Sequence, residues 1–196
     1  MGTVVPRTAP PHTGGVKRVL VVVAVTAFAV LAAGLYLFEP WRLLTSSTVD
    51  EALPVSEPAA GTQAPASAPA DAPDAPTVPA PAQDQVLARG TFEDAEHGTS
   101  GTARILQLAD GRRFLRLEAL ATSDGPDLHV WISDQPSGGE WGSYDDGRYV
   151  RLGDLKATNG NQNYEIPAET DLDDLTSVVI WCDRFNVAFG TAPVAL

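Results

Sequence analysis

An uncharged run of 20 residues, Val19 to Phe38, constrains this chain more than any other feature. At about 1.5 Å of rise per residue, a helix of that length spans roughly 30 Å, the thickness of the hydrocarbon layer of a bilayer. The sequence therefore predicts a transmembrane helix over residues 17–38. Three basic residues precede the run and one, Arg42, follows it closely. This bias predicts a plasma-membrane protein with a short cytoplasmic tail, residues 1–16, and a C-terminal part outside the cytoplasm.

A cleaved signal peptide is the alternative to an anchor. Signal peptides have shorter apolar cores, and their cleavage site of small residues is followed by polar chain. Here the small residues Ala32, Ala33 and Gly34 are followed by further apolar residues. The sequence therefore favours an uncleaved, single-pass anchor.

An Ala/Pro-rich segment follows the apolar run and predicts a linker. The stretch from Leu53 to Gln83 consists mainly of Ala and Pro, with almost no large apolar side chain. Such a segment cannot bury enough surface to offset the entropy of ordering it. Closely spaced prolines also favour an extended chain. We expect residues 39–85 to form a disordered linker.

The remaining residues, 86–196, carry the patterns of short strands. The segments ARILQL (103–108) and FLRLEAL (114–120) alternate apolar and polar residues, and the hairpin dipeptide Asp110-Gly111 lies between them. Further short apolar runs follow at intervals of about ten residues, and no stretch keeps a helical period. The sequence predicts an all-β fold, an antiparallel β-sandwich of about seven or eight short strands.

Charge and spacing exclude several classes of function. The net charge is −12, and residues 83–196 contain 19 acidic and 9 basic side chains, a net of −10. An acidic domain repels phosphate backbones, so a nucleic-acid partner is not expected. The chain contains neither zinc-ligand spacing nor a calcium-loop pattern, and no nucleophile elbow. Whether it is an enzyme stays open, but an electron-transfer or binding module is favoured over a catalyst.

Cys182, the single cysteine, ends the most apolar strand pattern, VVIWC. Alternation places it on one face with Val178 and Ile180, and places Trp181 on the other. Both faces are apolar, so the strand is expected to be central, and an inert core thiol is the first interpretation. Its position at the strand end and its expected location outside the cytoplasm instead favour a redox role.

His129 lies in the strand pattern LHVWI and shares a face with Trp131. A packed, hydrogen-bonded histidine is the more common outcome of that pattern. Two histidines and one cysteine are ligands that copper accepts, although sequence alone does not bring these residues together. His129 is therefore the first candidate for a second ligand beside Cys182, and the identity of any metal is unknown.

Three longer motifs resemble the DM-thirteen family, also called the electron-transfer DM domain. They are GPDLHVWIS (125–133), LGDLKATNGNQNYEIP (152–167) and SVVIWCDRFNVAFGTAPV (177–194). The resemblance implies a β-sandwich and a proposed role in extracytoplasmic redox or electron transfer. It also implies that Cys182 acts as a bare thiol or as the ligand of a prosthetic group such as haem. Any redox protein partner remains unidentified.

A non-enzymatic cell-surface binding module is the alternative function. Loop aromatics commonly carry binding, and Trp141, Tyr144 and Tyr149 lie in a segment rich in turn residues. In this alternative, Cys182 is a structural core residue and the partner is a surface protein or polymer.

Overall fold

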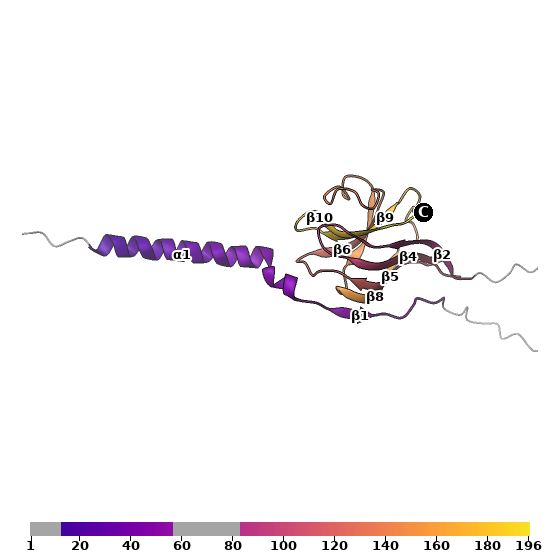
Figure 1. The fold of residues 1–196 in the computed structure, drawn as a ribbon, viewed down its shortest axis with the longest axis horizontal. Coiled ribbons are helices and arrows are strands. Elements are labelled where there is room, and N and C mark those ends of the chain that lie inside the picture. Colours follow the sequence, from indigo (N-terminus) through magenta and orange to yellow (C-terminus); the bar gives the residue numbers. More distant parts are fainter. Residues whose placement is uncertain (1–12, 57–82) are drawn as a thin grey trace, which may run out of the picture. The chain divides into compact units, whose positions relative to one another are not determined.

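The structure is a computed structural model that describes residues 13–56 and 83–196 (Figure 1). The chain divides into two units, Met1–Pro40 and Trp41–Leu196, which are described separately. Most of the expected cytoplasmic tail and the Ala/Pro-rich centre of the expected linker lie outside the described residues.

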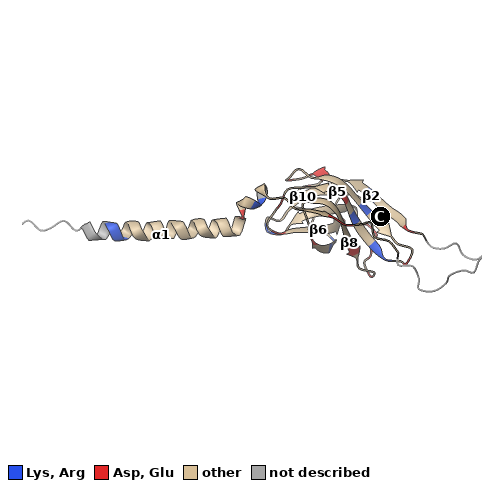
Figure 2. Ribbon diagram, turned by 90° about the horizontal axis from the view of Figure 1, so that it is seen from below, with Lys and Arg blue, Asp and Glu red and all other residues tan. Residues whose placement is uncertain are grey.

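The first unit contains one helix, α1 (Thr13–Phe38). Its segment Lys17–Phe38 is long and apolar enough to cross a membrane, and its side chains are not buried within the protein. Figure 2 shows basic residues only near the N-terminal end of this helix and no acidic residue along it. Glu39, with a φ of 42°, ends the helix, and a short 3-10 helix, η1 (Pro40–Leu44), follows. The structure confirms a long apolar helix.

The second unit contains two five-stranded sheets, which form a sandwich (Figure 1). The first sheet has the spatial order β1 (Thr48–Asp50), β8 (Asn159–Ile166), β5 (Arg113–Ala121), β4 (Ser100–Gln107) and β2 (Gln85–Thr91). The second sheet has the order β3 (Glu93–Asp94), β10 (Val187–Pro193), β9 (Ser177–Cys182), β6 (Leu128–Ser133) and β7 (Tyr149–Asp154).

Strands β6 and β9 are buried along their whole length. On one face of β9, Val178, Ile180 and Cys182 join the core between the two sheets. On the other face, Val179 and Trp181 pack in a second apolar cluster. The expected alternation and the central, doubly covered strand are both confirmed.

Residues 13–56 and 83–196 contain ten strands, so the expected count of seven or eight is too low. One additional strand is β3, whose two residues pair with β10. The other is β1, which pairs in parallel with β8 and comes from the segment expected to be linker. Its neighbour Glu51 receives hydrogen bonds from the Lys156 ammonium and from the Asn163 backbone N–H. Backbone and polar side-chain hydrogen bonds hold β1 in place, so no hydrophobic pattern in the sequence predicts this strand.

Gly160 in β8 allows β1 to approach. Its φ is +103°, and a Cβ there would overlap the carbonyl oxygen of Val49. We expect Gly160→Ala to destabilise the protein by about 1–3 kcal/mol more than Gly111→Ala. Gly111 also has a positive φ, of +89°, but a Cβ there would meet open space. The difference between the two variants therefore measures the clash with Val49 apart from the backbone strain that both share. Thermal unfolding gives the comparison, and hydrogen exchange should show lost protection in residues 48–50. Equal losses in the two variants would contradict the role assigned to Gly160.

Candidate functional site

Cys182 is the last residue of β9, and its side chain has no exposed surface. This burial raises the pKa of the thiol above its ordinary value, because a thiolate would lose its hydration. The backbone N–H groups of Phe185, Arg184 and Asp127 hydrogen-bond to the sulfur and partly oppose that rise. The negative charge of Asp127 adds to it. The sulfur is therefore a protonated thiol at neutral pH, beside three N–H donors.

The environment of Cys182 limits its chemistry. A protonated, fully buried thiol is a poor nucleophile, so thiol–disulfide exchange with another protein is disfavoured. A haem bound through Cys182 does not fit this packing either. The residue paired with it across β6 is Leu128, another member of the core, and no part of Cys182 faces a surface from which a large ring could approach.

His129 does not lie beside the cysteine sulfur. In the β6–β9 register, Leu128 is opposite Cys182 and His129 is opposite Trp181. Leu128 and Cys182 point into the core between the sheets, so His129 points to the other face with Trp181. The structure therefore does not bring Cys182 and His129 together as ligands of one ion.

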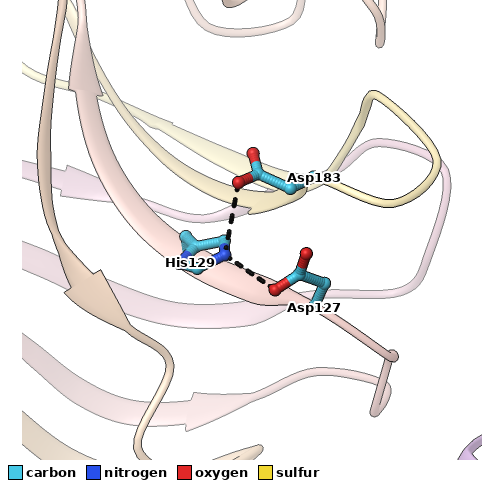
Figure 3. Close-up of side chains that lie close together, drawn as sticks. All are labelled: Asp127, His129 and Asp183. Atoms are coloured by element: carbon cyan, nitrogen blue, oxygen red, sulfur yellow. Dashed lines mark hydrogen bonds and ion pairs between the residues drawn. The ribbon is translucent and has the colours of Figure 1, made fainter.

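Three carboxylates surround the His129 ring instead, and Figure 3 shows two of them. Nε2 lies 3.0 Å from Asp127 Oδ1 and 3.4 Å from Asp183 Oδ2. Nδ1 lies 2.9 Å from Asp154 Oδ1, at ion-pair distance, and has no hydrogen-bond partner of good angle. The histidine side chain is only 9% exposed. Asp127, His129 and Asp183 form the one group in the described parts of the chain whose ligand atoms are placed to share a metal ion.

The fold explains why these residues meet. Asp127 directly precedes β6, and Asp183 directly follows β9, its antiparallel neighbour. The start of one strand therefore lies beside the end of the other. Asp154 ends β7, on the other side of β6, and is opposite His129 in the register. Sequence reasoning missed the three aspartates, because only the pairing of the three strands shows that they converge.

Aromatic rings line the same face of the sheet. The Trp131 ring stacks on Trp181 at 4.7 Å and on Tyr149 at 4.2 Å between centroids. Both tryptophans are buried, while Tyr149 is 41% exposed. Arg151 lies 5.5 Å above the Trp131 ring and donates a hydrogen bond to Asp183. The three rings form a continuous row from the surface to the residue that precedes Cys182.

The three expected binding-loop aromatics have different environments. Trp141 and Tyr149 are exposed. Tyr144, the third binding-loop candidate, is fully buried and offers no side-chain surface to a partner in this structure. Its hydroxyl donates to Pro136 O and accepts from the Gly139 N–H, which fixes the loop over the outer face of the sheet. A tyrosine among turn residues gives no sequence signal that separates an anchor from a contact.

A polar cavity of about 440 Å³ lies beside the histidine cluster. Two of the carboxylates described above, Asp127 and Asp154, line it. Arg42 and Lys156 contribute positive charge to the same wall. A small polar molecule or water therefore has access to these two carboxylates.

The raised thiol pKa predicts a pH dependence of stability. The unfolded thiol ionises near pH 8.5, while the folded thiol keeps its proton to higher pH. Below that pH the thiol is protonated in both states, and its contribution to the free energy of unfolding is fully present. This contribution is lost as the pH rises through the pKa of the folded thiol. We expect the free energy of unfolding of the wild type to fall more steeply between pH 8 and 10 than that of Cys182→Ala. Val178→Ala, a truncation on the same face, should keep the wild-type slope. Identical slopes in all three proteins would contradict the assignment.

Comparison with known proteins identifies the domain. The family model described as Electron transfer DM13 matches residues 91–194, which is more than half of the 196 residues. No curated protein and no solved structure matched the chain. The matched range includes all strands of the second sheet together with Cys182 and the histidine cluster. The chain belongs to the DM13 electron-transfer family.

Proposed function

We propose that this protein is a membrane-anchored, extracytoplasmic electron-transfer module in which Cys182 is the redox group. Membership of the DM13 family supports electron transfer as the activity. The row of stacked rings carries the assignment to Cys182, because it links a buried thiol with an exposed surface. Thiol, indole and phenol groups are the protein side chains that most readily lose one electron.

The row of rings offers an electron path between the buried sulfur and the protein surface. An electron acceptor cannot touch the sulfur, which has no exposed surface. Trp181 is one peptide unit from Cys182, and its ring contacts Trp131, which contacts Tyr149. A one-electron acceptor docked on the exposed face of Tyr149 would therefore reach the thiol in short steps. Such an acceptor is the class of partner that this function requires.

The step balances as the loss of one electron and one proton from the thiol. The S–H bond breaks and leaves a neutral sulfur radical, while the electron passes along the rings to the acceptor. The proton leaves to water at the turn after β9, where Arg184, Phe185 and Asn186 are exposed. Two of these residues direct their N–H groups at the sulfur, so this exposed turn packs directly against it. The reverse step restores the thiol.

The apolar helix supports the membrane part of the proposal. Segment Lys17–Phe38 has the length of a bilayer span, with basic residues at its N-terminal end. We assign it as an uncleaved plasma-membrane anchor, with residues 1–16 in the cytoplasm and the β-sandwich outside. In this arrangement Cys182 lies in an oxidising compartment, where its burial protects it from unwanted disulfides.

Oxidation by a flash-generated ruthenium(III) tris-bipyridyl complex tests the electron path in the full chain in detergent micelles. We expect transient indole and phenoxyl radicals that decay as the thiol is oxidised. Cys182→Ala should lengthen their lifetime several-fold, and Trp131→Phe should slow electron loss from the thiol several-fold. Trp141→Phe removes an exposed indole outside the row and should change neither rate. Radical lifetimes that are the same with and without Cys182 would refute the thiol as the redox group.

Labelling of intact cells tests the topology. In a Cys182→Ala background, Ser46→Cys, which is exposed and follows the helix, should react with a membrane-impermeant maleimide. Thr3→Cys should react only after permeabilisation. Labelling of Ser46→Cys only after permeabilisation would invert the topology, and a mature protein lacking residues 1–38 by mass would show a cleaved signal.

A further inference from the structure

We propose that Asp127, His129 and Asp183 form a binding site for a divalent transition-metal ion. Each of the three residues offers one ligand atom, and these atoms lie within 4.8 Å of one another. Nε2 is 3.0 Å and 3.4 Å from the two oxygens. A tetrahedral ion bonded at about 2.0–2.1 Å holds its ligand atoms roughly 3.3 Å apart. The distances from Nε2 to the two carboxylate oxygens are therefore close to the spacing that such an ion requires.

Charge balance at the histidine calls for a cation. Nε2 carries at most one proton, yet two carboxylates face it, so one of them is left without a donor from the ring. Asp154 places a third negative charge at Nδ1. Arg151 forms an ion pair with Asp183. A divalent ion would neutralise Asp127 and Asp183 together and leave His129 as a neutral ligand.

The position of Asp154 supports Nε2 as the metal-binding nitrogen. Histidine ligands usually direct their second ring nitrogen at a carboxylate, which orients the ring and raises its basicity. Here Nδ1 is buried without a hydrogen-bond partner, and Asp154 Oδ1 lies 2.9 Å from it, at ion-pair distance. His129 is 9% exposed and held between β7 and β9, so the ring is positioned before any ion binds.

The ligand set favours a transition metal over calcium or magnesium. Calcium takes six to eight oxygen ligands, and magnesium prefers oxygen in a strict octahedron. The imidazole nitrogen instead suits zinc, iron or copper. The adjacent cavity, lined by Asp127 and Asp154, would give water or a small ligand access to an ion bound at Asp127. Three protein ligands with an open position are typical of reactive rather than purely structural metal sites.

In this arrangement, the positive charge of Arg151 partly neutralises the Asp183 carboxylate, as a bound ion would. Its guanidinium donates to Asp183 Oδ2, the same oxygen that would bind the metal. Removing this positive charge should free the carboxylate and reduce repulsion of an incoming cation. The proposal therefore predicts opposite effects for two neighbouring changes: Asp183→Asn weakens binding and Arg151→Met strengthens it.

Calorimetric titration of the metal-free full chain in detergent micelles with Zn²⁺ tests the site. We expect one ion per chain, with the affinity reduced on the order of 100-fold by Asp183→Asn or His129→Gln. Arg151→Met should increase it by about tenfold. Asp146→Asn changes an exposed loop carboxylate outside the cluster and serves as the matched control, with unchanged affinity. Co²⁺ should give a visible absorption band in the wild type that Asp183→Asn abolishes.

The contrary outcomes are distinct. If no Zn²⁺ binding is measurable, the three residues form an ion-pair cluster and not a metal site. Equal Zn²⁺ affinity in the wild type, Asp183→Asn and Arg151→Met would lead to the same conclusion. Binding of Ca²⁺ in preference to Zn²⁺ would overturn the assignment to a transition metal. Cys182→Ala should keep the wild-type affinity, because the thiol points to the other face of the sheet. The experiments can therefore refute the metal site without refuting the electron-transfer proposal, and the reverse.

Discussion

The pairing of β6 with β9 is the constraint on which the rest of this domain depends. Both strands are buried on both faces, so their backbone groups must bond to each other and to their outer neighbours, β7 and β10. That pairing directs Cys182 into the core and the indoles to the opposite face. It also brings Asp127 beside Asp183 at the strand ends. The pairing of these two strands thus positions the thiol, the rings and the histidine cluster.

Burial has opposite consequences for the two kinds of group on this ladder. It keeps Cys182 protonated and out of reach of other thiols, which suits a site that exchanges electrons but forms no bonds. It also holds the His129 ring in place among carboxylates whose combined negative charge attracts a cation. The row of rings is the feature that makes a buried thiol compatible with electron exchange at the surface.

Sequence patterns predicted those parts of the structure that depend on apolar alternation. VVIWC and LHVWI gave the correct faces for Cys182, His129 and Trp181, because both strands are buried and a period of two is unambiguous. The same reasoning missed β1, which polar and backbone bonds hold, and it named Tyr144 as a binding-loop candidate although the structure buries this side chain. The aspartate cluster depends on register between strands far apart in sequence. No local pattern encodes that register.

The two faces of the second sheet separate two kinds of chemistry that would interfere if mixed. A metal ion bound directly to Cys182 would deprotonate it and fix its charge. Here the sulfur and the His129 ring point to opposite faces, so an ion at the cluster acts on the thiol only through the intervening sheet. Its charge would act more directly on Trp131, above which Arg151 already lies, and would make a positively charged indole radical less stable. An ion at the cluster would thus regulate the electron path without becoming part of the redox group.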